Sequence, residues 1–348
     1  MAARAFITGL SGPAITPDER AFLRAADPWG LILFKRNVRS PDQVAALIAE
    51  FRTAVGRADA PVLIDQEGGR VQRLGPPHWP AYPPGAVYGR LYDRNEALGL
   101  AAARLGGRLI AADLEALGIT VDCLPLGDVP VPGADAVIGD RAYGQTPAKV
   151  AALAGAIAEG LADGGVLPVL KHLPGHGRAL ADSHHKLPVV DADRASLEAS
   201  DFAAFRPLAG LPLGMSAHVV FTAFDTALPA TTSATIIAQV IRGWIGFEGL
   251  LMTDDLSMGA LSGTLAERTS AALAAGCDMA LHCNGSLSEM EAVASAAPEL
   301  AGRAGTRATA ALATRRAPAS VDLAAARAEF ARLIDEAAGT ATAQGARV

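Results

Sequence analysis

The chain has 348 residues, of which 51% are hydrophobic and 19% are charged, and its formal net charge is -6 at pH 7. This balance is typical of a soluble globular protein and excludes the basic excess of a nucleic-acid binder. No apolar run approaches the roughly 20 residues of a membrane helix, and the first one is too short for a signal peptide, so we expect a cytoplasmic protein. An odd number of widely spaced cysteines indicates reduced, buried thiols rather than disulfides or a zinc site; they are Cys123, Cys277 and Cys283.

Short apolar runs that favour strands recur eight times along the chain, at residues 5–10, 31–34, 61–65, 120–126, 166–172, 213–218, 250–255 and 279–284. Between most of them, apolar residues follow a helical spacing, as at 40–55, 94–118, 147–165 and 264–276. Apolar strands that alternate with helices indicate a parallel sheet covered on both faces. Eight such units predict an α/β fold with a single closed (β/α)8 TIM-type barrel.

An open, doubly wound sheet is the alternative fold, but it usually carries a GxGxxG phosphate loop after the first strand, and this chain has "GLSGPA" there. The loop at 75–89 is rich in proline and glycine and is expected to cross one end of the barrel. A C-terminal helix is expected at about 321–338, followed by a flexible tail. No domain linker is visible, so residues 1–348 are predicted to form one domain.

Polar residues collect where the predicted strands end, which is where barrel enzymes place their active sites. They come from five consecutive strands: Asp65, Arg70 and Arg73 follow the third, Asp128 and Arg141 the fourth, Lys171 and His172 the fifth, His218 the sixth, and Asp254 and Asp255 the seventh. We expect these groups to converge on one pocket.

Several of these residues also have a structural interpretation. Asp65 would form a structural salt bridge with either Arg70 or Arg73. Lys171 stands out, because the chain has only four lysines and a buried lysine is costly without a purpose. Arg141 lies between two glycines that suggest turns, where its guanidinium would suit a ligand's hydroxyl groups.

Asp254 and Asp255 are neighbours on a strand, so only one of them faces the barrel axis. A carboxylate at the pocket floor is a plausible nucleophile of the glycosidase kind. The other carboxylate would cap the segment that follows, and Asp255 is the nearer to it. Either assignment fits the spacing, although the cap favours Asp254 as the nucleophile.

The segment "KHLPGHGRALADSHH" at 171–185 holds four of the seven histidines. A metal site at His172 and His176 is one interpretation, but Pro174 and Gly175 oppose the helix that their spacing would need. The remaining histidines, His78, His218 and His282, are interpreted as a loop residue and two satisfied core residues.

The pair Asp182 and His184 gives this segment a different interpretation. A carboxylate two residues from an imidazole can fix its tautomer and favour its protonated form, as acid catalysis needs. Gly175 and Gly177 would let such a loop swing. An ordinary solvated loop is the alternative that the residues leave open.

The same segment closely resembles the K-H-F-P-G-H-G-x4-D-S-H signature of family 3 glycoside hydrolases, in their NagZ-type branch of bacterial β-N-acetylglucosaminidases. The other motifs of that family occur in the same order between about residues 30 and 285: "LILFKRN", "DQEGGRVQRL", "VIGDRAYG", "MSAHVV", "TDDLSMGAL" and "AGCDMALHCN". The chain departs from the pattern at Leu173 and Thr253, which are packing changes, and at His185, which leaves His184 favoured by the D-S-H spacing.

The resemblance implies a barrel that removes terminal N-acetylglucosamine (GlcNAc) from peptidoglycan fragments during cell-wall recycling, a process tied to cell shape and division. It implies Asp254 as nucleophile and His184 as acid/base, oriented by Asp182. Residues that match the family's positions for holding sugar hydroxyls are Asp65, Arg73, Arg141, Lys171 and His172.

No metal or other cofactor is expected, and the partner expected is a small muropeptide rather than a nucleic acid or a membrane. The protein is expected to be a monomer. The sequence leaves two alternative functions open: a β-glucosidase or xylosidase of the same family, and an inactive barrel that binds muropeptides.

Overall fold

A closed barrel of eight parallel strands forms the centre of the protein, whose structure is a computed structural model that describes residues 3–339. Around the barrel the strands follow the order β1 (Arg4–Thr8), β12 (Met279–His282), β11 (Leu250–Asp255), β9 (Leu213–Ser216), β7 (Leu167–Leu173), β6 (Val121–Asp122), β3 (Val62–Ile64) and β2 (Pro28–Leu33). Each of the eight apolar runs overlaps one of these strands. The predicted (β/α)8 barrel is therefore confirmed.

Alternation along the strands divides the core into two layers. Val169 of β7 and Leu250 and Met252 of β11 fill the barrel interior. Leu170 and Leu251, at the positions between, pack outward against the helices. Strands that are apolar on both faces are thereby buried on both faces, which is why the sequence showed continuous apolar runs.

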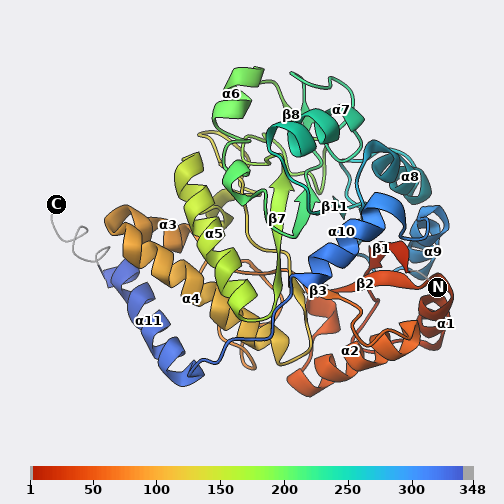
Figure 1. The fold of residues 1–348 in the computed structure, drawn as a ribbon, viewed down its shortest axis with the longest axis horizontal. Helices are drawn as coiled ribbons and strands as arrows, with labels where there is room; N and C mark the ends of the chain where they lie inside the picture. The colour runs from red at the N-terminus through yellow and green to blue at the C-terminus, as the bar shows by residue number, and fades with distance from the viewer. Residues whose placement is uncertain (1–2, 340–348) are drawn as a thin grey trace.

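Helices cover the outside of the barrel (Figure 1). The longer ones are α1 (Pro17–Ala26), α2 (Pro41–Val55), α3 (Gly85–Arg94), α4 (Glu96–Glu115), α5 (Pro147–Asp163), α8 (Leu265–Ala275), α9 (Leu287–Ala296), α10 (Gly302–Ala313) and α11 (Leu323–Gly339). Capping side chains fix several N-termini: Ser40 accepts from the Gln43 amide of α2, and Thr264 forms a capping box with Glu267 at α8.

Short elements lie mostly in the loops. They are the hairpin β4 (Gln66–Gly68) and β5 (Val71–Gln72), the pair β8 (Val189–Val190) and β10 (Val220–Phe221), α6 (Arg194–Ala199), α7 (Ala234–Ile236), the π-helix η4 (Ile237–Trp244), and the 3₁₀ turns η1 (Lys35–Asn37), η2 (Gly139–Arg141) and η3 (Arg206–Leu208).

Two differences between the predicted and observed element boundaries stand out. Strand β6 has two residues where the apolar run suggested seven, although the backbone beyond it still bonds β7: the Val169 amide donates to the Leu124 carbonyl and the Lys171 amide to the Pro125 carbonyl. The helix expected at 94–118 begins at Glu96, since α3 ends at Arg94 and Asn95 caps α4 through the Leu98 amide.

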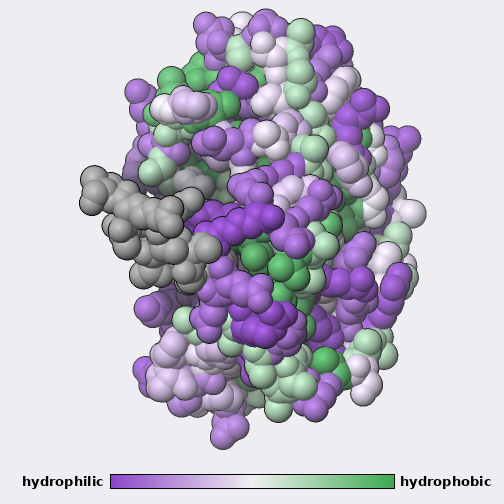
Figure 2. Space-filling model, turned by 90° about the vertical axis from the view of Figure 1, so that its left-hand side faces the viewer, coloured by the Kyte–Doolittle hydropathy of each residue, from purple (hydrophilic) through white to green (hydrophobic). Residues whose placement is uncertain are grey.

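The C-terminal helix expected at about 321–338 lies at Leu323–Gly339 and packs beside α3 and α4 (Figure 1). The tail at 340–348 lies outside the described residues. Hydrophilic residues make up most of the face in Figure 2, with hydrophobic ones in small groups between them.

All three cysteines are free and buried, as expected. Among residues 3–339, no helix is both long and apolar enough to cross a membrane.

Candidate active site

The strands aim three predicted site residues into the mouth of the barrel. Asp65, Lys171 and Asp254 each lie two residues beyond a side chain that fills the barrel interior. Because side chains on a strand alternate with a period of two, the three continue inward-facing rows at the carboxyl ends of β3, β7 and β11. They converge, as the sequence predicted.

Charged side chains of alternating sign form a continuous chain across this mouth. The two oxygens of Asp65 accept from Lys171 Nζ at 3.0 Å and from Arg73 Nη2 at 2.7 Å. Lys171 Nζ also lies 2.7 Å from Glu67 Oε1, and Glu67 accepts two bonds from Arg141, at 2.7 and 2.8 Å. We call these five residues the charge chain.

Burial makes the charge chain interdependent. The side chains of Lys171 and Glu67 are only 2% and 4% exposed. Burial alone would lower the pKa of Lys171, but Asp65 and Glu67 raise it well above the ordinary value. Burial would likewise raise the pKa of Asp65, and Lys171 and Arg73 hold it far below its usual range. Lys171 and Asp65 are therefore charged at neutral pH, and each depends on its neighbours.

Asp254 is an ionised carboxylate beside the charge chain. Burial would raise its pKa, but His172, His218 and Lys171 hold the pKa below the ordinary value, and one carboxylate oxygen accepts from the Asp255 amide at 2.8 Å. An ionised carboxylate on the barrel axis is chemically suited to attack an electrophilic carbon.

Asp255 has the structural role expected of the other carboxylate. Its oxygens accept from the Ser257 amide at 3.1 Å, from the Ser257 hydroxyl at 2.6 Å and from the Cys283 amide at 3.1 Å. These bonds close the turn after β11. The geometry thus separates the two neighbours as the cap argument favoured.

Asp128, after β6, binds two histidines of the 171–185 segment. One oxygen bonds His172 Nδ1 at 2.7 Å, and the other accepts from the His176 amide at 2.6 Å. Burial would raise the pKa of Asp128, and His172 and His176 lower it below its ordinary value. This carboxylate therefore fixes the ring of His172 beside Asp254.

The Asp182–His184 pair predicted from the sequence is present. Asp182 Oδ1 lies 2.7 Å from His184 Nδ1 and accepts from the His184 amide at 2.9 Å. Burial would raise the pKa of Asp182, but its hydrogen bonds to His184 lower it below the ordinary value. The His184 side chain is 61% exposed, unlike the buried charge chain, and its turn is bonded to the loop after β11 through the Gly259 amide.

Other predicted residues lie outside this arrangement. Arg70 donates to the carbonyls of Ala136 and Val137 and pairs with Asp140 at 3.4 Å, so the partner of Asp65 is Arg73 rather than Arg70. His78 is exposed in its loop, against Trp79.

The two core histidines differ in how fully they are bonded. Both ring nitrogens of His218 have partners, Thr231 Oγ1 and the Asp255 carbonyl, as expected of a satisfied core residue. His282 bonds Glu289 at 3.0 Å through Nε2, while its buried Nδ1 has no partner in the described part of the chain.

Glu67 is a member of the charge chain that the sequence did not reveal. It follows a strand end in "DQEGG", where loop carboxylates are usually solvated, and nothing in the spacing shows that the β4–β5 hairpin turns it inward. The hairpin depends on Gly68 and Gly69, both at positive φ, and a Cβ on Gly68 would lie 2.3 Å from the Pro83 carbonyl.

Within residues 3–339, no three His, Cys, Asp or Glu side chains are grouped to hold a metal ion. His172 Nδ1 and His176 Nε2 instead bond Asp128 and Ser183.

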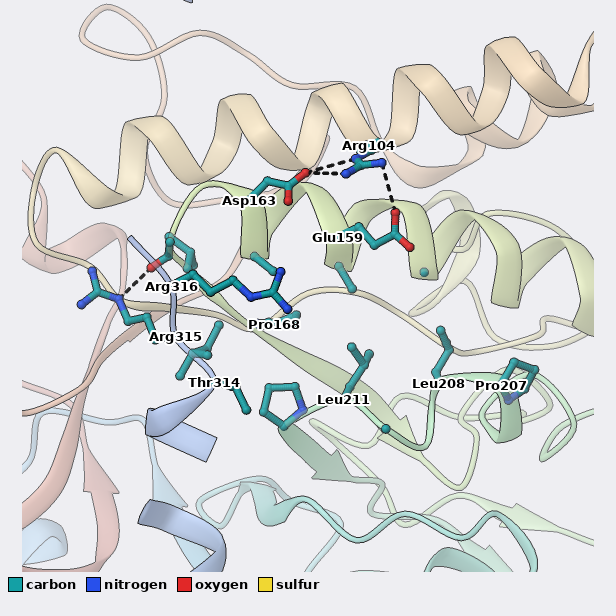
Figure 3. A pocket seen from close by; sticks show the side chains of 18 residues that line it. Arg104, Glu159, Asp163, Pro168, Pro207, Leu208, Leu211, Thr314, Arg315 and Arg316 are labelled. Carbon is teal, nitrogen blue, oxygen red and sulfur yellow. Dashed lines mark hydrogen bonds and ion pairs between the residues drawn. The ribbon is translucent and has the colours of Figure 1, made fainter. Parts of the chain in front are cut away.

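A cavity of about 740 Å³ opens at the other end of the barrel, between α5 and the start of β7 (Figure 3). Its lining includes Leu167 and Pro168 at the N-terminal end of β7, Arg316, and Arg104, which pairs with Asp163. None of the predicted site residues lines it. Volume alone does not identify the site, because chemistry in this fold belongs at the carboxyl ends of the strands.

Fold and site together define a TIM-barrel enzyme that combines an axial carboxylate, the charge chain and an exposed Asp–His pair. Residues 9–310 match the model of the glycosyl hydrolase family 3 N-terminal domain. The chain belongs to glycoside hydrolase family 3.

Within this family, the chain is similar to β-hexosaminidases and to a solved NagZ structure. A β-hexosaminidase of Alkalilimnicola ehrlichii is 43% identical over 282 residues, 79% of each chain. One of Methylococcus capsulatus is 42% identical over 279 residues, 79% of this chain and 81% of the relative. The structure of native NagZ from Neisseria gonorrhoeae aligns with a TM-score of 0.84 at 31% identity, covering 97% of this chain and 98% of that one.

Proposed function

We propose that the protein is a retaining exo-β-N-acetylglucosaminidase that removes non-reducing terminal GlcNAc from peptidoglycan fragments, such as GlcNAc linked to 1,6-anhydro-N-acetylmuramic acid. The observation that carries this proposal is the ionised carboxylate of Asp254 on the barrel axis, beside the charge chain and with an Asp–His pair at the outer rim.

The catalytic class rests on the family. A family 3 barrel whose relatives are β-hexosaminidases at about 40% identity is a β-N-acetylhexosaminidase. The finer parts of the proposal, peptidoglycan fragments as substrate, a cytoplasmic location and a part in cell-wall recycling, are supported by the family motifs in the sequence. We propose that the barrel and α11 act as one domain and as a monomer.

In the first chemical step, an Asp254 oxygen attacks the anomeric carbon and the glycosidic C–O bond breaks. The His184 imidazolium gives its proton to the departing oxygen. Asp182 Oδ1, 2.7 Å from His184 Nδ1, holds the ring in the orientation that this transfer needs. The products of this step are a covalent glycosyl-enzyme and the released aglycone.

In the second step, water attacks the anomeric carbon and releases Asp254 as a carboxylate. The His184 imidazole, neutral after the first step, takes the proton from that water. Two displacements at one carbon retain its configuration. A histidine fits this role because the charge of Asp254 is absent while the imidazole acts as a base.

The sugar's hydroxyl groups would be held by Asp65, Arg73, Arg141, Lys171 and His172. The charge chain arranges these donors and acceptors before the sugar binds, so little reorganisation is needed. Arg73 Nε is buried and has no partner among the described residues.

Trapping the covalent intermediate tests the proposal. A 2-fluoro sugar with an activated leaving group should label the peptide that contains Asp254, and Asp254→Ala should lower kcat/KM by roughly 10⁴-fold or more. Label on another peptide, or a product with inverted configuration, would contradict the nucleophile assignment.

Substrate choice needs a separate comparison. Nitrophenyl GlcNAc should be cleaved far better than the nitrophenyl glucoside or xyloside, and a GlcNAc–anhydro-N-acetylmuramic acid disaccharide should be cleaved as well. Preference for the glucoside or xyloside would favour those activities, and binding without turnover would favour an inactive muropeptide-binding barrel.

A further inference from the structure

One residue of the exposed 182–186 turn points into the protein. Ser183 is 2% exposed, whereas its neighbours His184, His185 and Lys186 are exposed. The Ser183 hydroxyl lies 3.0 Å from His176 Nε2, and His176 is itself 3% exposed. The turn that carries the Asp–His pair is therefore attached to the buried part of the molecule through this serine.

The other end of the contact is held firmly. The His176 amide donates to Asp128 at 2.6 Å, and the same carboxylate bonds the ring of His172 beside Asp254. Burial lowers the pKa of His176 to about 4, so the ring is neutral at working pH. Ser183 thus reaches the inner pocket through His176, Asp128 and His172.

The loop after β11 holds the backbone of the same turn. The Gly259 amide donates to the His184 carbonyl and the Ala260 amide to the Ser183 carbonyl, both at 3.1 Å. These bonds hold the turn's backbone and do not depend on the serine hydroxyl. The Ser183–His176 bond is a side-chain contact between this turn and the segment that follows β7.

We propose that His176 is a positioning residue whose hydrogen bond to Ser183 fixes the turn that carries Asp182 and His184 at the pocket rim. The inference rests on the proposed role of His184 as acid/base. It assigns a function to the second histidine of "KHLPGHG", for which neither a metal nor a ligand is needed.

The inference predicts a defect that depends on the leaving group. Loss of the bond misplaces the proton donor but leaves Asp254 in position. The kcat/KM for a GlcNAc disaccharide, whose leaving group needs a proton, should fall by roughly tenfold, the effect of one neutral hydrogen bond. The kcat/KM for nitrophenyl GlcNAc should change by less than about twofold, because nitrophenolate leaves without a proton.

Four variants separate positioning from simple damage. His176→Leu and Ser183→Ala each remove the bond, and His176→Gln keeps a donor near the position of Nε2. The double variant of His176→Leu and Ser183→Ala should be no worse than either single change, since both break the same bond. His176→Gln should recover most of the loss on the disaccharide.

Two reference variants complete the experiment. His184→Ala measures the leaving-group dependence when the acid is absent. His282→Leu removes a buried histidine bond of the same length, to Glu289, and should affect both substrates equally.

The outcomes are distinct. A disaccharide-specific loss with rescue by glutamine supports the inference. Suppose that His184→Ala shows the dependence on the leaving group. Equal losses on both substrates in His176→Leu and Ser183→Ala, or no loss in either, then overturn the inference. If His184→Ala shows no dependence, the acid/base assignment fails and this inference fails with it.

Discussion

Glu67 joins the two halves of the charge chain, because Lys171 and Arg141 share its carboxylate. Glu67→Ala leaves both cations in a buried site with fewer partners. Breaking a buried ion pair from one side costs about 3–5 kcal/mol. We expect the free energy of unfolding, measured with urea, to fall by about that amount.

An exposed pair provides the control. Arg194 and Glu198 lie 2.7 Å apart on the surface, with the arginine side chain 60% exposed. Glu198→Ala should change the free energy of unfolding by no more than about 1 kcal/mol. Similar losses in the two variants would show that burial does not govern the Glu67 pairs.

The sequence could predict those site residues that lie at the carboxyl end of an apolar strand. Asp65, Lys171 and Asp254 could be predicted because they lie where apolar strands end, although the choice of Asp254 over Asp255 depended on the cap and not on the period of two. Glu67 could not be found, because the turn that points it inward depends on contacts between the β4–β5 hairpin and residues 82–84. Local sequence does not encode such contacts.

The buried carboxyl group of Asp122 has a raised pKa, whereas the pKa of Asp65 is lowered. Asp122 accepts one bond, from the Gln66 amide at 3.0 Å, and its other oxygen has no partner in the described structure. Burial raises its pKa well above the ordinary value. Above the unfolded pKa of about 4, the unfolded chain releases this proton more readily, so folding becomes less favourable as pH rises.

Asp122→Asn removes that pH dependence. The amide resembles the protonated acid and does not ionise in the unfolded chain. Relative to the wild type, the variant should gain up to about 1.4 kcal/mol per pH unit above pH 4, until the folded pKa is reached, and should show little difference near pH 3. Urea unfolding at several pH values measures this. A difference that does not change with pH would contradict it.

Helix α5 contains two glycines that should respond oppositely to the same substitution. A Cβ on Gly160 would lie 2.0 Å from the Arg104 carbonyl of α4, whereas a Cβ on Gly155 would meet only Leu208 at 3.6 Å. Gly160→Ala should therefore force the two helices apart and destabilise by about 1–3 kcal/mol.

Gly155→Ala is the matched control for that change. It should stabilise by about 0.5–1 kcal/mol, because alanine is the better helix former and no backbone atom is displaced. Thermal or urea unfolding of both variants is the measurement. Stabilisation of both would show that close α4–α5 contact is not needed.

Strands and helices could be predicted where a single apolar pattern indicates them. Close contacts between elements could not be predicted in this way. The eight strands and the main helices follow from apolar runs and spacing. Gly177, expected to give the 171–185 segment mobility, instead allows close packing, since a Cβ there would lie 2.2 Å from the Val129 carbonyl. Gly175, at a φ of 147°, has the conformation that favours glycine.

At the scale of the whole molecule, the site makes the fold sensitive to acid. Four carboxyl groups at the barrel mouth have pKa values below their ordinary range, each against the effect of burial: Asp65, Glu67, Asp128 and Asp254. A carboxyl group with a depressed folded pKa stabilises the fold above its unfolded pKa of about 4. That contribution is lost as pH falls through the folded value.

We therefore expect the free energy of unfolding to fall steeply below about pH 4, with uptake of protons on unfolding. Lys171→Met tests the cause, because Lys171 lowers the pKa of Asp65, Glu67 and Asp254 together. The variant should be less stable at neutral pH, and its stability should change less between pH 5 and 3, since less carboxylate stabilisation remains to be lost. An unchanged slope in that range would place the acid sensitivity elsewhere in the molecule.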